Sequence, residues 1–181
     1  CKDNFGLTVL PPSVNNSQWH FVASDPTTVV YGLGAIKGVG ESAVESIVTA
    51  RRQGKFRDLY DFCNRVDIKK VGKRTLEALV KSGSFDDLAQ SIAPDLVASN
   101  KPYNIRAGLW RQIPTAMQAA EQNRQNKESG TLDLFGEIDD GLSVAPALEN
   151  VVWSDKERLT GEDATLGLYL TGHPIDEYKA E

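Results

Sequence analysis

Cysteine, histidine and long apolar runs are all scarce in this sequence, and each shortage excludes a class of protein. Only Cys1 and Cys63 are present among 181 residues, so the chain has neither a disulfide framework nor a zinc site with four ligands. No stretch approaches the roughly 20 consecutive apolar residues of a membrane-spanning helix, and no basic segment leads into an apolar one at the N-terminus. We therefore expect a cytoplasmic protein without a membrane partner.

Catalytic and metal-binding groupings are missing as well. The acidic pairs in "DLYD", "FDDL" and "EIDDG" lack the partners and the spacing of a metal site, and surface or helix-capping roles suit them better. His20 and His173 each lack a ligand partner nearby, and Cys63 falls on an apolar face, where we expect a core residue. We expect no catalytic residue, no metal site and no cofactor in this chain.

The residues that are present are those of a globular protein of one or two domains, since 40% are hydrophobic and 25% are charged. The chain begins with Cys rather than Met and ends on "HPIDEYKAE", so we expect a piece of a longer protein. Its function is then expected to be shared with segments outside it.

Charge is distributed very unevenly behind the net value of -5. Residues 51–84 hold ten Lys or Arg and four acids, a balance of +6, whereas residues 128–181 hold three bases and thirteen acids, a balance of -10. The first region is able to meet a polyanion, and the second would be repelled by it.

Short β-rich runs stand near the N-terminus. Residues 18–23 and 28–33 are separated by "SDPT", which favours a turn, so a hairpin is expected. The preceding "LPPSVNNS" is expected to be irregular surface chain, because its two prolines remove backbone donors.

Most of the remaining sequence has helical spacing. Helices are predicted over residues 41–53, from about 59 to 66 and over about 73–81, with Gly54 and Gly83 suited to the ends of the first and third. Residues 104–127 also have helical spacing, with Pro114 as a kink or a break. The expected fold class is mainly α, with a small β-hairpin near the N-terminus and a partly irregular C-terminal segment.

An internal repeat explains the position of several glycines. "IKGVGESAVESI" (36–47) aligns with "IKKVGKRTLEAL" (68–79), with Ile, Lys, Val, Gly and a later Glu coinciding. Each copy is a turn followed by an amphipathic helix, which is the signature of a helix-hairpin-helix motif, here in tandem. The second copy departs from the pattern, because Lys70 stands in the place of Gly38.

Glycine in such a turn predicts an anion site. Because glycine tolerates positive φ and has no Cβ, backbone N–H groups near the turn are able to converge on one anion at the helix start. A DNA phosphate is such an anion, and its contact is blind to base sequence. The alternative is that Gly-Val-Gly only makes a tight turn between packed helices. The candidate DNA-binding residues are Lys37, Gly38, Val39, Gly40, Arg51, Arg52, Lys69, Lys70, Gly72, Lys73 and Arg74.

Five stretches resemble, in the same order, the bacterial DNA polymerase III alpha subunits, the C-family replicative polymerases, in the region after their catalytic domain. They are "VLPPSVNNS", "YGLGAIKGVGESAVESIVTAR", "FRDLYDFCNRVD", "RTLEALVKSGSFD" and "LGLYLTGHPIDEY", and together they cover nearly the whole chain. The resemblance implies that the parent protein is a DNA-directed DNA polymerase, a nucleotidyltransferase of DNA replication. The family's Mg²⁺-binding palm aspartates have no counterpart here, so this fragment is not expected to polymerise DNA.

The resemblance also implies a division of the chain. Residues 1–33 would close the fingers domain, and 34–90 would form the tandem helix-hairpin-helix module on duplex DNA. We expect a helical extension over 91–127, an exposed segment over 128–150, and a connector over 151–181 toward an absent oligonucleotide-binding domain.

In that family a short internal peptide binds a hydrophobic pocket of the ring-shaped sliding clamp, the beta subunit. "TLDLF" matches the peptide at Leu132, Asp133, Leu134 and Phe135, but Thr131 stands where Gln is usual, so one polar contact is missing. The alternative is an apolar segment packed on its own domain. The expected partners are duplex DNA, the sliding clamp and other subunits of the replicative polymerase holoenzyme.

The residues alone leave two other functions open. Repair glycosylases with a helix-hairpin-helix carry a catalytic acid downstream of the hairpin, and Asp58 lies downstream here, although "RDLYDFC" also gives it the features of a helix-start residue. The other alternative is a protein-interaction module whose basic region meets an acidic partner instead of DNA.

Overall fold

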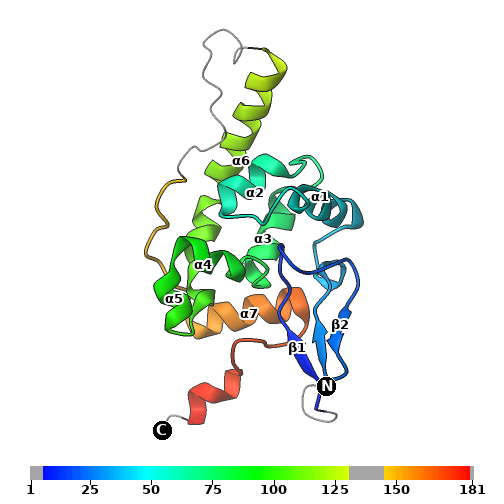
Figure 1. Ribbon diagram of the computed structural model, residues 1–181. Coiled ribbons are helices and arrows are strands. Elements are labelled where there is room, and N and C mark those ends of the chain that lie inside the picture. Colours follow the sequence, from blue (N-terminus) through cyan, green and yellow to red (C-terminus); the bar gives the residue numbers. More distant parts are fainter. Residues whose placement is uncertain (1–5, 131–144, 180–181) are drawn as a thin grey trace.

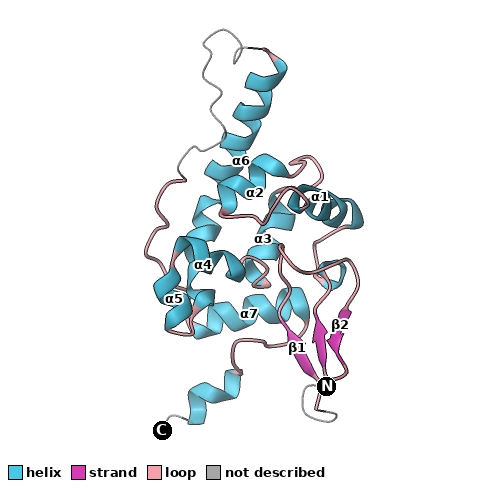
Figure 2. Ribbon diagram, viewed as in Figure 1, coloured by secondary structure: helices cyan, strands magenta, loops and turns pink. Residues whose placement is uncertain are grey.

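Helices make up most of the computed structural model, which describes residues 6–130 and 145–179 (Figures 1 and 2). The fold is mainly α, as predicted, with a small sheet near the N-terminus. The α-helices are α1 (Glu41–Arg51), α2 (Leu59–Arg65), α3 (Lys73–Lys81), α4 (Ala89–Ile92), α5 (Pro94–Ala98), α6 (Arg106–Glu128) and α7 (Asp155–Leu166). Short 3-10 helices are η1 (Leu33–Ala35), η2 (Asp86–Leu88), η3 (Pro102–Ile105) and η4 (Pro174–Lys179).

The N-terminal sheet contains the expected hairpin and one strand that the sequence did not predict. β2 (Val22–Asp25) and β3 (Thr28–Val30) pair in antiparallel fashion, so the hairpin begins later than residue 18. β1 (Thr8–Leu10) pairs with β3 in parallel, which gives the order β1-β3-β2. The hairpin turn is held by Asp25, whose Oδ1 accepts a hydrogen bond from the Thr27 N–H at 2.8 Å.

The expectation that "LPPSVNNS" is surface chain was wrong. Val14 is fully buried, and Ser13 and Ser17 are nearly so. The loop is buried without pairing as a β-strand. Side chains supply hydrogen-bond partners for its backbone and for the backbone of the chain beside it. Arg51 Nη1 donates to the carbonyls of Val14 and Ser17, and Asn15 exchanges two hydrogen bonds with the backbone of Phe56.

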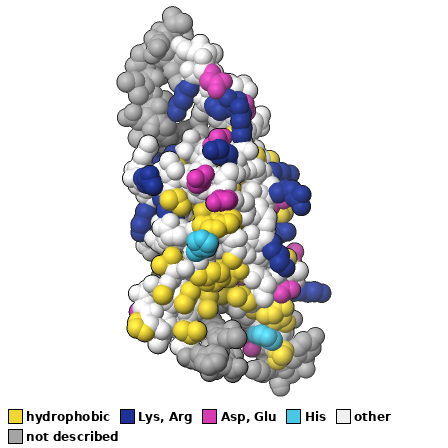
Figure 3. All heavy atoms as spheres, turned by 90° about the vertical axis from the view of Figure 1, so that its right-hand side faces the viewer, with side chains coloured by type: hydrophobic (Ala, Val, Ile, Leu, Met, Phe, Trp, Pro, Cys, Tyr) yellow, Lys and Arg dark blue, Asp and Glu magenta, His cyan; other side chains and the backbone are white. Residues whose placement is uncertain are grey.

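Apolar side chains remain exposed on the sheet. Leu10, Phe21 and Val22 are 40%, 48% and 43% exposed. In Figure 3, which looks onto the side where α1 and β2 lie, apolar side chains gather over the lower half, and many Lys and Arg lie along one edge. The described part of the chain therefore leaves this apolar surface uncovered.

The core lies between α1, α2, α3 and α6. Phe62 of α2 packs edge-on against Phe56 and Phe85, with ring centroids 4.8 and 4.9 Å away. Cys63 is 1% exposed, and burial raises the pKa of its thiol to about 12, so the prediction of a core residue is confirmed. The thiol is thus protonated and inert at neutral pH.

Two helices differ from the sequence expectation. α6 runs through Pro114 without a break, with Leu109, Ile113 and Ala120 buried on one side and Pro114 on the exposed side. α7 lies within residues 151–181, for which no helix was predicted, and it begins with a capping box between Ser154 and Glu157. The spacing Ser-x-x-Glu is the sequence signal that could have found it.

Candidate nucleic-acid interface

The sequence repeat becomes two hairpins, and the first of them packs on the helix that follows the second. The first hairpin (residues 36–40) leads into α1, and the second hairpin (residues 66–72) leads from α2 into α3. Thr75 Oγ1 of α3 donates to the Gly38 carbonyl at 3.2 Å. A Cβ at Gly38 would lie 3.3 Å from the Ala78 Cβ, so the first hairpin packs closely on α3.

The two hairpins turn by different means. Gly38 has φ of +96°, a conformation that side chains other than glycine adopt only with strain. Lys70 occupies the equivalent place in the second hairpin, where Asp67 shapes the turn instead. The Asp67 carbonyl accepts from the amides of Lys70 and Val71 at 2.9 Å, and its Oδ1 accepts from the Lys69 N–H at 3.0 Å. An Asx turn therefore replaces the missing glycine.

The last residue of each hairpin is a glycine that leaves the start of the following helix open. Gly40 and Gly72 are the N-caps of α1 and α3, and neither helix receives a side-chain capping bond. Their φ values, -89° and -76°, suit any residue, and a Cβ at either position would meet nothing within 4 Å. Neither conformation nor packing requires these glycines, and no side chain at the N-cap covers the first-turn amides.

The capping at α1 and α3 differs from that at α2 and α7. Asp58 caps α2, with Oδ1 accepting from the Asp61 N–H at 2.7 Å, and Ser154 caps α7. The first intrahelical bonds of α1 and α3 run from Val44 to Gly40 and from Leu76 to Gly72. The amides before them have no acceptor in their own helix and, with the helix dipole, form a positive pole.

Most of the predicted basic residues surround these helix starts. Lys37, Lys69, Lys70, Lys73 and Arg74 are exposed there, whereas Arg52 is exposed at the opposite end of α1, as its C-cap. Within residues 6–130 and 145–179, only Lys73 among them forms an ion pair, a surface contact with Glu77 at 4.0 Å. Arg51 differs, because its Nη1 is bound to two carbonyls of the N-terminal loop and burial lowers the pKa of the side chain. Val39 is buried, so only its backbone is available.

The predicted clamp-binding residues, Thr131 to Phe135, lie outside the described part of the chain. The chain on their C-terminal side is anchored on α6. Gly108 provides a notch for Leu148, because a Cβ there would lie 2.6 Å from the Leu148 Cγ. Gln112 Nε2 donates to the Pro146 carbonyl at 3.1 Å, and Trp110 meets Trp153 edge-on with ring centroids 5.8 Å apart.

The structure offers little for catalysis among its described residues. Asp58, the residue that a glycosylase would need, is a helix cap, as the alternative interpretation held. A cavity of about 770 Å³ lies beside it, lined also by α5, α6 and residues 145–152. In the described part, no group of three or more His, Cys, Asp or Glu gathers as metal ligands.

None of the described helices is both long and apolar enough to cross a membrane.

Comparison with known proteins points to one group. Residues 6–94 match the helix-hairpin-helix motif family. The chain is 46% identical, over 97% of its length, to DNA polymerase III subunit alpha of Pseudomonas aeruginosa, and 44% identical, over 100%, to that of Vibrio cholerae. The corresponding values for Escherichia coli K12 are 40% and 97%. The chain spans about 15% of the length of each of these relatives.

Proposed function

The chain belongs, along nearly all of its length, to the family of DNA polymerase III alpha subunits, and we propose that it holds the backbone of duplex DNA through its two hairpins. The whole protein would be a DNA-directed DNA polymerase of replication. This segment would bind the duplex without taking part in catalysis.

The observation that carries the proposal is the pair of uncapped helix starts at Gly40 and Gly72. Ser, Asp or Asn would cap these helices better than glycine. Glycine is favoured where a ligand must approach the backbone closely, and a phosphate fits both the converging amides and the dipole. Two such starts, with the first hairpin packed on α3, suit a ligand with repeated phosphates.

The two hairpins would bind DNA in different ways, the first mainly through backbone amides and the second mainly through basic side chains. Lys37 of the first hairpin is offset by exposed Glu41, so this hairpin relies on backbone amides. The second hairpin has Lys69 and Lys70 before Gly72, and Lys73 and Arg74 after it, all exposed. It would supply most of the Coulombic attraction, which depends on salt but not on base sequence.

Duplex affinity is expected to fall steeply with salt. With up to six exposed basic residues in play, the slope of log affinity against log salt should lie between about -2 and about -5, at roughly -0.9 per phosphate. Changing Lys69 and Lys70 to Ala should make the slope shallower by about 2. Fluorescence anisotropy with two duplexes of different sequence measures both the slope and the sequence preference.

The matched control changes two exposed lysines outside the hairpins, Lys101→Ala with Lys127→Ala, and should leave the slope unchanged. A salt-independent affinity, or a strong preference for one duplex sequence, would contradict the proposal. Capture of an acidic protein that excess duplex fails to displace would favour the protein-interaction alternative. Release of a damaged base would favour the glycosylase alternative.

We further propose that residues 131–135 bind a sliding clamp. The support is the pattern of "TLDLF" and its isolation between polar "NRQNKESG" and acidic "GEIDDG". Leu134 and Phe135 would enter an apolar pocket together, while Thr131 replaces the usual Gln only weakly. Attachment to DNA at the hairpins would then raise the overall avidity through effective concentration.

The clamp proposal predicts that Leu134→Ala with Phe135→Ala weakens binding to the purified sliding clamp by about tenfold or more, because such anchors concentrate binding energy. Calorimetric titration of both proteins against the clamp measures the loss. Duplex affinity should stay unchanged in the same variant, because the hairpins are intact. Equal clamp affinities would show that the clamp is bound elsewhere or not at all.

A further inference from the structure

The first hairpin is held from a second side by the C-terminal end of α7. The Lys37 N–H donates to the Thr165 carbonyl at 2.9 Å, and Tyr31 Oη, on the chain entering η1, donates to the Leu166 carbonyl at 3.0 Å. The last carbonyls of a helix have no partner in their own helix, so these bonds satisfy both elements. The first hairpin therefore lies between α7 on one side and α3, through Thr75 and Ala78, on the other.

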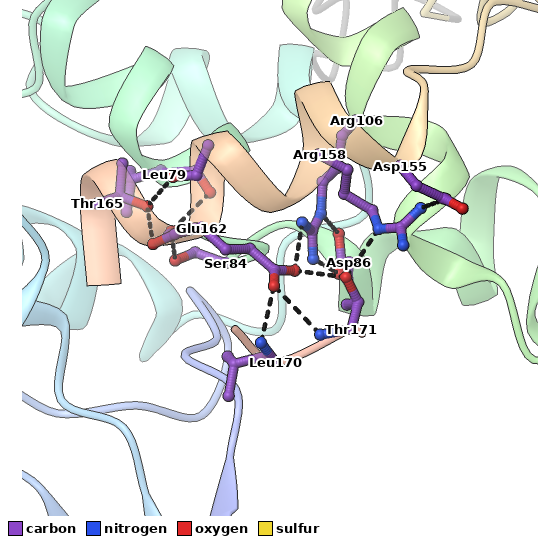
Figure 4. A network of polar contacts seen from close by, with 12 residues as sticks. Leu79, Ser84, Asp86, Arg106, Asp155, Arg158, Glu162, Thr165, Leu170 and Thr171 are labelled. Atoms are coloured by element: carbon purple, nitrogen blue, oxygen red, sulfur yellow. Dashed lines mark hydrogen bonds and ion pairs between the residues drawn. The ribbon is translucent and has the colours of Figure 1, made fainter. Parts of the chain in front are cut away.

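The position of α7 is in turn fixed by a buried carboxylate, Glu162 (Figure 4). Glu162 is 0% exposed and its Oε1 accepts from Arg106 Nη1 of α6 at 2.9 Å. The same guanidinium forms a two-point pair with Asp86, at 2.9 and 2.6 Å. Arg106 thus ties α7 to α6 and to the turn that follows α3.

Glu162 also holds the chain that leaves α7. Its Oε2 accepts from the amides of Leu170 and Thr171 at 2.7 and 3.1 Å, and its Oε1 accepts from Thr171 Oγ1 at 2.7 Å. Every one of these carboxylate contacts is a directional hydrogen bond, and the carboxylate itself is fully buried. A shift of α7 along or about its axis would break these bonds and move the Thr165 and Leu166 carbonyls that the first hairpin uses.

We infer that Glu162 is a positioning residue for the first hairpin: through α7 it sets the backbone at Lys37, and thereby the amides at Gly40 that would receive a phosphate. The inference rests on the proposed DNA binding. Glu162 should affect the first hairpin but not the second. The turn of the second hairpin is held by hydrogen bonds to Asp67, and none of them involves α7.

A double-mutant cycle on the full chain tests this selectivity. Duplex affinity is measured with and without Glu162→Gln in three backgrounds, which are the unaltered chain, Gly40→Asp and Gly72→Asp. Each aspartate blocks one hairpin. Glu162→Gln should lower affinity by between about 2-fold and about 30-fold in the unaltered chain and with Gly72→Asp. It should have no further effect with Gly40→Asp, because the first hairpin is already blocked.

Tyr31→Phe provides a milder second variant, since it removes only a hydroxyl, which donates to the Leu166 carbonyl at 3.0 Å and, at the longer distance of 3.4 Å, to the Ala35 carbonyl, and it should show the same dependence on background. Circular dichroism verifies that each variant is folded. Equal losses in all backgrounds, or no loss in any, would overturn the inference while the proposed DNA binding stands. If the unaltered chain does not bind duplex at all, the proposed function and this inference both fall.

Discussion

Duplex binding is expected to be lost when Gly40 and Gly72 are both changed to aspartate, while the fold is kept. An aspartate at each N-cap would accept the first-turn amides, place a negative charge where a phosphate would lie, and cap the helix at least as well as glycine. Hydrogen bonds to charged groups contribute about 1.5–3 kcal/mol each, so losing both sites should weaken binding at least about 100-fold. Anisotropy titration at low salt measures the loss, and thermal unfolding should show an unchanged or slightly higher Tm.

Two controls separate occupation of the helix start from charge. Asparagine at the same two positions caps the helices without a charge, so its loss of affinity should be smaller than that of aspartate. Gln90→Asp places the same charge on α4, at an exposed position on the far side of the fold from α1, and should leave affinity nearly unchanged (Figure 1). Unchanged affinity in the folded Gly40→Asp and Gly72→Asp double variant would contradict phosphate binding at these helix starts.

The local structure of the hairpins could be predicted from the sequence because it depends on residues close together in the chain. The apolar spacing predicts a helix over about 73–81, and α3 spans Lys73–Lys81. Gly54 and Gly83, expected at helix ends, have φ of +133° and +81°. Short-range rules of period and helix termination are sufficient here.

The separate roles of the two glycines could not be read from their spacing. Gly38 makes the turn, and Gly40 leaves the helix start open, a distinction that needs the backbone angles. The departure at Lys70 is explained by Asp67, three residues earlier, whose Asx turn is a sequence signal that could have been found. The candidate Arg51 is turned toward the N-terminal loop by carbonyls that no local pattern reveals.

The buried ion network is the part that sequence reasoning missed most completely. Arg106 is 20 residues from Asp86 and 56 residues from Glu162, so no spacing rule connects them. Single charged residues in helical segments are most often solvated, and these three give no sign of burial. They meet where α6 packs on the turn after α3 and α7 packs on both (Figure 4).

Changing Arg106 to Met is therefore expected to lower the free energy of unfolding by about 3–5 kcal/mol at neutral pH, because it leaves the fully buried Glu162 carboxylate and the largely buried Asp86 carboxylate without a cation. Chemical denaturation measures the loss. Arg111→Met is the matched control on the same helix. Its ion pair with Glu149 is more than half exposed, at 56% and 57%, so that variant should lose no more than about 1 kcal/mol.

The pH dependence of the Arg106→Met variant identifies the cause of its instability. Burial raises the pKa of the Asp86 carboxyl even with Arg106 beside it, and without Arg106 the rise should be larger. A carboxyl whose pKa is higher in the folded than in the unfolded state stabilises the fold below its unfolded pKa, and this contribution is lost as pH rises through the folded pKa. The stability gap between the variant and the unaltered chain should therefore narrow as pH is lowered from about 7.5 to about 5. A gap that stays constant over this range would indicate lost packing, since the volume of the side chain does not titrate.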